Sequence, residues 1–381
     1  MGGDYMRNVG NLFKYLDKLA HGFWNCKKIL TYGRPVIIVT GSRSTGKSTN
    51  VAIFTLLDFL ENGKKFIYSR RRDKDTRLTC KTFFNNAVDI INREGDFKIL
   101  GFKYEHHAYY IATEYKEMED GDEEPELNWV KCGEAIPLAN EEDYKSAVYS
   151  DYCTIIYDEF ISKNRNRYLG TKDTPEAEWD ALTSLYQTVD RGIDKPFRNE
   201  TRLFLLANKD TAYNPVMLSL NVCDYITPGA KFTAPKGKVW VWENVKSVEA
   251  TSEIQESFGY QMSSEHTQKY AYENESSYDT TFFIKKPKVS SHFATLKLKG
   301  IVYEVRVDSE YNFYILDKVK GNYSIIALDN DSHDNNDLRL IRRWQESPTM
   351  TIIESAYRDG RLYFGNGKIQ AAFVRYLDFM R

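Results

Sequence analysis

The sequence has few of the features that would place the protein in a membrane, an oxidising compartment or a zinc-binding class. Its five cysteines are scattered along 381 residues and form no C-x-x-C pair or Cys/His cluster. This pattern argues against structural zinc and favours a reducing compartment. No apolar run approaches the roughly 18 residues needed to cross a bilayer, and the N-terminus lacks the apolar core of a signal peptide. We expect a soluble, cytosolic protein with no membrane contact.

The sequence also lacks an excess of charge of either sign. Its 52 Lys and Arg residues oppose 54 Asp and Glu residues, which gives a formal net charge of −2. Any contact with nucleic acid must therefore come from local basic patches and not from a global field. There is no internal repeat, and the length allows two domains around ordinary apolar cores.

What the sequence does contain is a phosphate-binding loop between an apolar strand and a helix. Residues 36–40 are a β-branched apolar run typical of a buried parallel strand, and residues 41–48 (GSRSTGKS) match G-x-x-x-x-G-K-[ST]. The two glycines let backbone N–H groups point at an anion, and the next helix turns its positive dipole end toward the same phosphates. The residues expected to bind nucleotide are Gly41, Ser42, Arg43, Ser44, Thr45, Gly46, Lys47 and Ser48.

This loop predicts a site for ATP and Mg²⁺. In such loops the lysine, here Lys47, reaches the β- and γ-phosphates, and the following hydroxyl, here Ser48, ligates the metal. A second motif lies downstream, where the apolar strand Tyr152–Tyr157 leads into two carboxylates. We expect Asp158 to hold the Mg²⁺ shell and Glu159 to activate water, because one carboxylate cannot easily do both.

The order Asp158-Glu159 indicates the division of P-loop ATPases that has an extra strand between the two motif strands. The strand predicted at 65–69 is a candidate for that position. Another buried strand, 202–207, ends at Asn208, which either senses the γ-phosphate or forms a turn. The amphipathic helix predicted for 175–189 leads into Arg191, a cation that can interact favourably with the helix dipole.

Two charged stretches have more than one interpretation. The run 70–74 (RRRDK) follows a strand and either contacts phosphate or DNA or is a solvated charge run. Strands at 98–104, 107–113 and 129–130 predict a β-hairpin with an acidic tip over 114–126. Such a tip repels a phosphate backbone, so we expect it to lie away from any DNA path.

The pattern along the chain divides it into three parts. Residues 1–247 carry the P-loop motifs and predict an α/β ATPase domain with a mainly parallel sheet. Residues 248–277 are polar and predict a helical linker. Residues 278–381 alternate in the manner of antiparallel strands (280–284, 293–299, 301–307, 313–316 and 324–328) and then predict helices at 349–357 and 369–379 with a strand at 361–364 between them.

With these motifs placed, the chain resembles the DNA-packaging (encapsidation) ATPases of the smallest tailed phages, the Picovirinae type whose prohead carries an RNA ring. The resemblance runs from the P-loop to the C-terminus. The chain departs from the family pattern in a longer N-terminal lead-in and an enlarged acidic hairpin. The stretches that carry the resemblance are 41–48, 66–71 (FIYSRR), 135–138 (AIPL), 154–161 (TIIYDEFI), 188–191 (TVDR), 206–208 (LAN) and 214–215 (NP).

The resemblance implies an ASCE P-loop ATPase domain, a linker, and an RNase H-like domain that is a vestigial nuclease. It implies a motor that hydrolyses ATP and translocates viral double-stranded DNA into a preformed prohead. The partners would be the DNA, the prohead RNA and the portal (connector) protein, with the chains forming a homopentameric ring. The motor would work in the host cytoplasm, attached to the prohead, and would be absent from the mature virion.

The resemblance also assigns roles to single residues. Arg191 matches a trans-acting arginine finger, and Lys145 a second trans-acting basic residue. Arg43 falls where packaging motors often carry a basic residue inside the P-loop. In the C-terminal domain, Arg339, Arg342 and Arg343 are candidate phosphate contacts to the prohead RNA.

Three other functions compete with the motor. A helicase, or another P-loop nucleic-acid translocase, would need strand-separating elements that the sequence does not show. A terminase large subunit with an active nuclease would need several acids converging on two metals, whereas Asp308, Asp317 and Asp329 form no such cluster by order or spacing. A non-catalytic adaptor that binds RNA and portal is disfavoured because Lys47 and Glu159 are both present.

Overall fold

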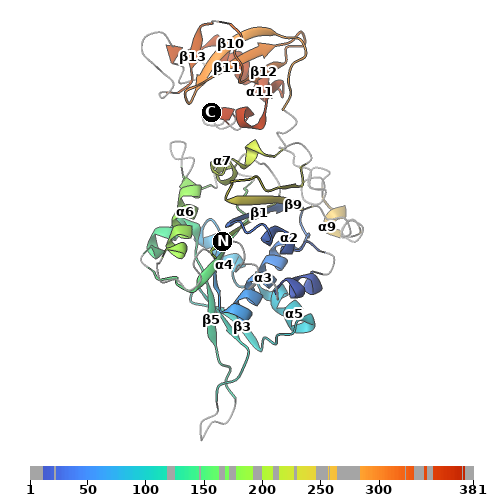
Figure 1. Ribbon diagram of the computed structural model, residues 1–381, viewed down its shortest axis with the longest axis vertical. Coiled ribbons are helices and arrows are strands. Elements are labelled where there is room, and N and C mark those ends of the chain that lie inside the picture. The colour runs from blue at the N-terminus through green and yellow to red at the C-terminus, as the bar shows by residue number, and fades with distance from the viewer. Residues whose placement is uncertain are drawn as a thin grey trace. The chain divides into compact units, whose positions relative to one another are not determined.

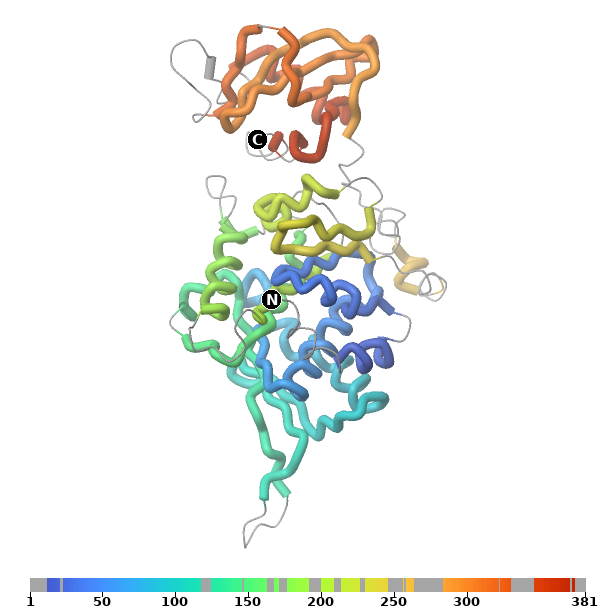
Figure 2. Tube along the Cα trace, in the orientation of Figure 1, coloured from blue at the N-terminus to red at the C-terminus, as the bar shows by residue number. Residues whose placement is uncertain are grey.

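The computed structural model falls into two compact units. The first comprises Met1–Asp210 and Lys231–Ser277, and the second comprises Thr211–Ala230 and Tyr278–Arg381. Figures 1 and 2 show both units. The residues that the structure describes are 12–20, 23–117, 125–145, 147–162, 168–170, 177–191, 200–208, 214–226, 230–245, 256, 258–263, 284–321, 323–329, 339–340, 346–370 and 372–373.

The first unit is built on a nine-stranded sheet in the order β3-β4-β5-β2-β6-β7-β1-β9-β8. The six strands from β5 to β9 in that order pair in parallel, and antiparallel strands occupy both edges. This confirms the mainly parallel α/β sheet. In chain order the strands are β1 (Val36–Gly41), β2 (Lys65–Ser69), β3 (Gly101–Glu105), β4 (Ala108–Ala112), β5 (Val130–Ala135), β6 (Tyr152–Asp158), β7 (Arg202–Asn208), β8 (Phe232–Thr233) and β9 (Trp240–Val245).

The central strand β1 is buried along its whole length because it has parallel neighbours on both sides and helices near the sheet. All six of its residues are buried, which is why the sequence there is a continuous apolar run and not an alternating one. Its register pairs Val36 with Leu203 of β7 and with Trp240 of β9. The chain therefore carries the P-loop out of the middle of the sheet.

The strand between the two motif strands is β7, and the prediction that the 65–69 strand occupies this position was wrong. β7 pairs with β1 on one side and with β6 on the other, whereas β2 lies beyond β6 and pairs with β5. The physical reason is long-range: β2 and β7 are equally apolar and equally buried. Local pattern therefore cannot tell which of them pairs with β1.

Helices pack on this sheet and complete the first core. The P-loop helix α3 ends at Gly63, whose φ of 70° and N–H bond to the Phe59 carbonyl form a C-terminal helix stop, for which the pair Asn62-Gly63 is a sequence signal. Buried side chains of α3, of the lead-in helix over residues 12–19 and of α5 share one apolar cluster with Ile37 and Val39. The helices of this unit are α2 (Lys27–Leu30), α3 (Lys47–Asn62), α4 (Asp73–Thr79), α5 (Asn85–Glu94), η1 (Leu138–Tyr144, a 3₁₀ segment), α6 (Ala177–Asp190) and α9 (Phe258–Gln261).

The predicted acidic hairpin is present as the antiparallel pair β4 and β5. An isolated bridge between Tyr115 and Leu127 extends the pairing toward the tip. Residues 118–124 of the tip lie outside the described residues. On the same sheet edge, Lys103 lies 4.6 Å from the centre of the Trp129 ring, which places a cation over a half-buried aromatic.

The second unit contains a six-stranded sheet in the order β14-β13-β10-β11-β12-β15. Its first three strands are antiparallel, and β13 and β14 add in parallel beside the first of them. If β10 to β14 are counted as strands 1 to 5, their order across the sheet is 3-2-1-4-5. This is the RNase H-like sheet that the family resemblance implied, with β15 as an additional parallel edge strand. The elements are α7 (Pro215–Ser219), η3 (Val222–Asp224), β10 (Ser291–Leu298), β11 (Ile301–Val307), β12 (Phe313–Leu316), β13 (Ile325–Ala327), β14 (Arg339–Leu340), α11 (Pro348–Arg358) and β15 (Leu362–Phe364).

Some predicted features lie partly or wholly outside the described residues. Of the linker over 248–277, only α9 and a few neighbouring positions are described, and most of the strand at 280–284 and of the helix at 369–379 is not. Residues 211–230, which were expected in a domain ending at 247, group with the second unit. Within the described part of the chain, no helix is both long and apolar enough to cross a membrane.

Candidate nucleotide site

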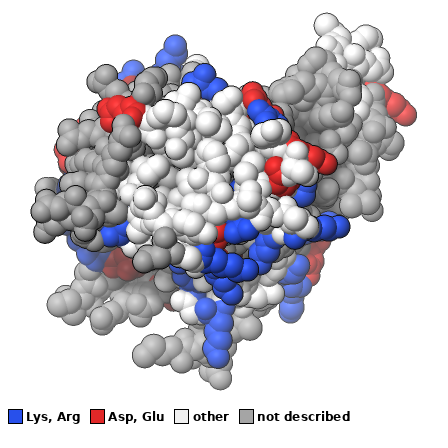
Figure 3. Space-filling view, turned by 90° about the horizontal axis from the view of Figure 1, so that it is seen from above, with Lys and Arg blue, Asp and Glu red and all other residues white. Residues whose placement is uncertain are grey.

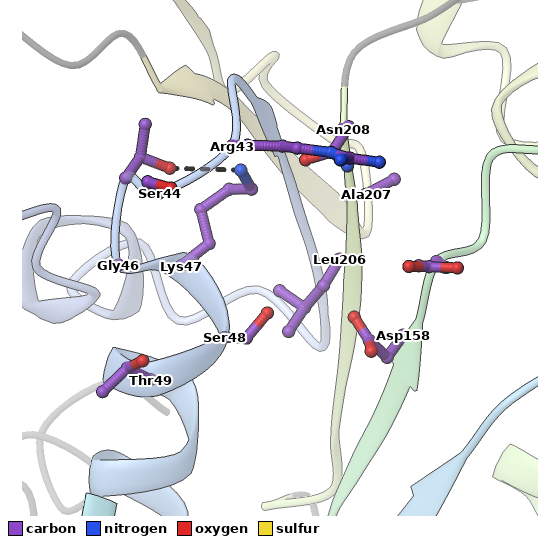
Figure 4. Close-up of a pocket in the computed structure, with 12 residues that line it drawn as sticks. Arg43, Ser44, Gly46, Lys47, Ser48, Thr49, Asp158, Leu206, Ala207 and Asn208 are labelled. Atoms are coloured by element: carbon purple, nitrogen blue, oxygen red, sulfur yellow. Dashed lines mark hydrogen bonds between the residues drawn. The ribbon is translucent and has the colours of Figure 1, made fainter. Parts of the chain in front are cut away.

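The candidate site is a cavity of about 240 Å³ at the carboxyl end of the central strands of the first unit. The P-loop and the start of α3 form one wall, and the ends of β6 and β7 form the other (Figure 4). In open α/β sheets, ligands bind at this end of parallel strands. The cavity is lined by Arg43, Ser44, Thr45, Gly46, Lys47, Ser48, Thr49, Asp158, Glu159, Leu206, Ala207 and Asn208.

Two P-loop glycines are required by close backbone approach. Gly41 has a φ of 153°, and a Cβ there would lie 2.3 Å from the Val245 carbonyl oxygen. Gly46 has a φ of 80°, and a Cβ there would lie 2.7 Å from Cβ of Phe23. Gly46 is also the N-cap of α3 and makes no side-chain capping bond. The first N–H groups of α3 therefore remain available to an anion.

Lys47 is held against its own loop. Its Nζ donates to the carbonyl oxygens of Gly41 (3.2 Å) and Ser42 (2.5 Å) and to Oγ1 of Thr45 (3.1 Å). Burial lowers the Lys47 pKa to about 8, and the nearby Asp158 carboxylate opposes part of that shift. The site thus holds a desolvated ammonium group that a polyphosphate would neutralise.

Gly41 and Ser42 shape the loop and do not line the cavity. Ser42 is buried, and its side chain makes no hydrogen bond to any described residue. Its carbonyl oxygen and that of Gly41 accept from Lys47. Of the eight P-loop residues predicted to bind nucleotide, the other six line the cavity.

Ser48 and Asp158 face each other across the cavity and fit the expected Mg²⁺ shell (Figure 4). A hydroxyl and a carboxylate are hard oxygen donors, and Mg²⁺ commonly takes one or two such groups together with phosphate oxygens and water. Burial raises the Asp158 pKa to about 6, while Arg70 opposes this shift and Glu159 adds to it. The hydroxyl oxygen of Tyr68 lies 3.3 Å from Oδ2 of Asp158. A divalent cation would compensate the charge that burial disfavours.

Glu159 lies just past the end of β6 in a strained conformation. Its φ is 55°, which is uncommon for a residue other than glycine. Its side chain is 61% exposed and forms an ion pair with Arg70. The next residue is anchored, because Phe160 N–H donates to the Leu206 carbonyl oxygen at 3.2 Å. The expected water activator is therefore paired with an arginine.

Arg43 and Asn208 lie on the same side of the cavity. Figure 4 shows the Arg43 side chain extending from the P-loop to lie beside Asn208 at the end of β7. Both residues line the cavity, so both can reach the terminal phosphate of a nucleotide bound along the P-loop.

Arg191 and Lys145 do not line the cavity of their own chain. The Arg191 guanidinium donates to the backbone carbonyl oxygen of Lys145. The Lys145 ammonium pairs with Glu142 (3.1 Å) and Glu141 (3.5 Å), and Glu141 accepts from Ser184 Oγ of α6 at 2.8 Å. The fold therefore places the two predicted trans-acting residues beside each other.

Sequence reasoning missed the roles of the arginines after β2. The run 70–74 was expected either to contact phosphate or to be solvated, but Arg70 pairs with Glu159 and Arg71 pairs with Glu178 inside the protein. The pairing of Arg70 with Glu159 could have been predicted from one signal. Parallel strands β2 and β6 end at the same sheet edge, so the basic residues that follow β2 face the acidic residues that follow β6.

Comparison with known proteins gives the site a family context. A family model described as podovirus DNA encapsidation protein (Gp16) matches residues 16–380. The chain belongs to this DNA encapsidation family. It is 26% identical to the DNA packaging protein of Bacillus phage phi29 over 353 residues, which is 91% of this chain and 95% of that protein. It is also 26% identical to the DNA packaging protein of Bacillus phage B103, over 89% of this chain and 95% of that protein.

Solved structures show that the fold is shared. The structure titled "The bacteriophage Phi-29 viral genome packaging motor assembly" contains a chain that matches with a TM-score of 0.65 and 24% identity, covering 94% of this chain and 99% of that one. A chain of "The Phi-28 gp11 DNA packaging Motor" matches with a TM-score of 0.58 and 16% identity, covering 93% and 98%. The encapsidation-family protein described here thus shares a fold with chains of two packaging motors.

The buried ammonium leads to a prediction for Lys47→Met. At neutral pH the lowered pKa corresponds to a folding cost on the order of 2–3 kcal/mol, so the variant should be more stable than the wild type without nucleotide. Between the folded pKa of about 8 and the unfolded value, the unfolded state binds more protons. Wild-type stability should therefore rise with pH in that window, and the advantage of Lys47→Met should shrink.

Urea unfolding at pH 7 and pH 10 measures this difference. The control is Lys81→Met, which removes an exposed lysine and should change stability little at either pH. If Lys47→Met were less stable than the wild type at pH 7, burial of the ammonium would not be costing folding energy.

Proposed function

We propose that the protein is an ATP-hydrolysing motor that translocates viral double-stranded DNA into a preformed prohead. The observation that carries the proposal is that Lys47, Ser48, Asp158 and Glu159 line one cavity in a chain of the DNA encapsidation family. A P-loop lysine, a metal-binding hydroxyl and a carboxylate pair are the parts that phosphoryl transfer to water requires.

The proposed chemistry assigns each group one task. Lys47 and the α3 N-terminus hold the phosphates, and Ser48 and Asp158 would hold Mg²⁺, which neutralises charge on the phosphate oxygens. Glu159 orients and deprotonates the attacking water. Asn208 and Arg43 contact the terminal phosphate. Because Glu159 is paired with Arg70 in the free chain, hydrolysis requires that this ion pair open.

Arg191 and Lys145 act on a neighbouring subunit in this proposal. Both are absent from the cavity of their own chain. Lys145 directly follows η1 and Arg191 directly follows α6, and these two elements contact each other. A homo-oligomeric ring, a pentamer in our proposal, would present these two elements to the next subunit's ATP. Both side chains are exposed, and their present partners are a backbone carbonyl, the buried Glu141 and the exposed Glu142, so these contacts can exchange at low cost.

The second unit is proposed to bind the prohead RNA and the portal protein. Within residues 284–370, exposed basic side chains outnumber exposed acidic ones, and Figure 3 shows Lys and Arg gathered along one margin of the face it displays. The exposed basic residues described are Lys285, Lys286, Lys288, Lys299, Lys318, Lys320, Arg358 and Lys368, and the acidic ones are Glu310, Asp317, Glu346 and Asp359. Of the predicted contacts, Arg339 lies in β14, and Arg342 and Arg343 lie outside the described residues.

We infer that this unit does not cut DNA. No cluster of three or more His, Cys, Asp or Glu side chains that could hold a metal occurs among the described residues. The three acids near strand ends each accept a hydrogen bond from a different donor. Asp308 accepts from Tyr314 Oη (2.8 Å), Asp317 from Asn366 (3.2 Å) and Asp329 from the Lys299 N–H (2.7 Å). A terminase with an active nuclease remains the alternative that this inference opposes.

The setting proposed for the motor is the host cytoplasm, on the prohead and not in the mature virion. The DNA packaging proteins that the chain resembles and the motor fold support a role confined to genome packaging.

Glu159→Gln should bind ATP with near wild-type affinity and lose nearly all turnover. The amide preserves the shape of the site but cannot accept the proton of the attacking water. Nucleotide titration and steady-state hydrolysis measure the two effects. Asp151→Asn, at the opposite end of β6, is the matched control and should leave turnover unchanged. Normal turnover in Glu159→Gln would remove this residue from the mechanism.

Arg191 should act in trans, and mixing two inactive variants tests this. An arginine finger contributes roughly 10³–10⁵ in rate, or about 4–7 kcal/mol. Arg191→Ala and Arg191→Lys should bind ATP but lose the stimulation that ring assembly gives, because a point charge cannot replace a planar fork. Mixed rings of Arg191→Ala and Lys47→Ala contain some interfaces with both groups intact, so they should exceed either parent. Absence of recovery in proven mixed rings would leave Arg191 acting in cis or serving only structure.

The RNA and nuclease proposals are tested on the full chain. A triple alanine variant of Arg339, Arg342 and Arg343 should weaken prohead-RNA binding without changing basal ATPase activity. Wild-type RNA binding should fall steeply as salt rises, and DNA incubated with the protein and Mg²⁺ or Mn²⁺ should stay uncut. Unchanged RNA binding by the triple variant would reject these contacts, and metal-dependent cleavage would reject the loss of nuclease activity.

A further inference from the structure

The mechanism proposed above assigns no role to a buried ion pair next to the nucleotide site. Arg71 follows β2, and its Nε and Nη2 donate to the two carboxylate oxygens of Glu178 at 2.7 and 2.8 Å. The Arg71 side chain is 7% exposed and the Glu178 side chain is 0% exposed. Glu178 belongs to the first turn of α6. The pair therefore joins the end of a central strand to the start of the helix that runs toward Arg191.

The Arg71 guanidinium also holds the turn that carries Glu159. Its Nη2 donates to the Phe160 carbonyl oxygen at 2.8 Å and lies 3.5 Å from the Glu159 carbonyl oxygen. Both carbonyls belong to the turn in which Glu159 has its unfavourable positive φ. A strained backbone conformation persists only where the surroundings fix it, and Arg71 supplies donors to both carbonyls of this turn.

Other contacts fix Glu178 in turn. Tyr157 Oη donates to its Oε1 at 2.8 Å, and the Leu169 N–H donates to its Oε2 at 3.0 Å. The Arg71 guanidinium carbon lies 4.7 Å from the centre of the Tyr168 ring. Together these contacts connect the ends of β2 and β6, the turn after β6 and the first turn of α6.

Stability alone does not account for this arrangement. Removing two charges from water costs several kcal/mol per ion, and well-packed apolar residues of similar volume often serve the fold equally well. The bidentate bond to Glu178 instead fixes the plane of the Arg71 guanidinium, and the contacts with the two carbonyls fix that plane against the Glu159–Phe160 turn.

We propose that Arg71 is a positioning residue for hydrolysis: held by Glu178, it fixes the Glu159–Phe160 turn against the base of α6. Arg71 does not itself line the cavity, and the cavity-lining residue that it contacts is Glu159, so it acts through Glu159. The inference rests on the proposed ATPase function and adds the element that sets where the Glu159 carboxylate lies once Arg70 releases it.

Arg71→Lys should lower kcat about 10²-fold, the order of loss that a displacement of about 1 Å causes, with KM for ATP changed little. Lysine keeps the charge near Glu178 but cannot donate to the carboxylate and the Phe160 carbonyl in one plane. ATP binding measured directly should stay near wild type, because the P-loop is untouched. A kcat within twofold of wild type in a folded Arg71→Lys protein would overturn the proposal.

A double variant separates positioning from folding. Arg71→Met combined with Glu178→Leu removes both charges and should restore the thermal stability that either single change loses. It should not restore kcat, because no donor remains for the Phe160 carbonyl. If kcat recovered together with Tm, the pair would serve only the fold.

The matched control is the buried pair between Arg202 of β7 and Asp58 of α3. Its atoms lie 3.2 Å apart and both side chains are 2% exposed, but Arg202 starts β7 at the end opposite the cavity. Arg202→Met combined with Asp58→Leu should change Tm without a specific loss of kcat. An equal loss of kcat in this control would show that the Arg71 effect is general destabilisation.

Two further variants distinguish failure of this inference from failure of the proposed function. Lys47→Ala and Glu159→Gln test the ATPase site itself. If both hydrolyse ATP normally, the proposed function is wrong and Arg71 has nothing to position. If both are inactive while Arg71→Lys is normal, the function stands and only the role of Arg71 is rejected.

Discussion

Parallel pairing of β7 with both β1 and β6 is the constraint on which the site depends. Its register places Gly41 opposite Asn208 and Asp158 opposite Leu206. Parallel strands end at one edge, so three separate stretches of sequence deliver the P-loop, the carboxylate pair and the asparagine to one cavity. β7 contributes no catalytic acid or base, yet its width sets the spacing across which Ser48 and Asp158 face each other.

Three of the functional charged side chains bond to groups within the chain. Lys47 donates to its own loop, Glu159 pairs with Arg70, and Arg191 donates to the Lys145 carbonyl. These three contacts differ in how readily they exchange. Lys47 is buried, so only a ligand with strong negative charge can compensate it. Arg191 is exposed, so its contact costs little to open. The Glu159–Arg70 pair lies between these cases, because the carboxylate is 61% exposed but the guanidinium is only 12% exposed. A bound nucleotide would therefore compensate the buried Lys47 ammonium, which a ligand of weaker negative charge could not do.

Sequence alone predicted the parts of the site whose geometry is local. The P-loop, the strand leading to Asp158 and the stop at Gly63 follow from short patterns with a direct physical meaning. It failed where the outcome depends on which distant segments meet. The strand at 65–69 and the strand at 202–208 look alike, so the strand between β1 and β6 was misassigned. Arg70 and Arg71 are adjacent in sequence but reach two different carboxylates, because successive side chains after a strand point to opposite sides.

Because Arg70 and Arg71 point to opposite sides, they contact different parts of the region that joins Glu159 to α6. Arg70 reaches the side chain of Glu159, while Arg71 holds the backbone of the same residue and, through Glu178, the base of α6. Releasing the carboxylate from Arg70 therefore need not release the turn, so the carboxylate can swing while its backbone stays fixed. The same clamp keeps α6, and with it Arg191, in a defined position relative to the cavity. In the proposed motor, a fixed turn would let the Glu159 carboxylate change partner without moving the surface that the subunit presents to its neighbour.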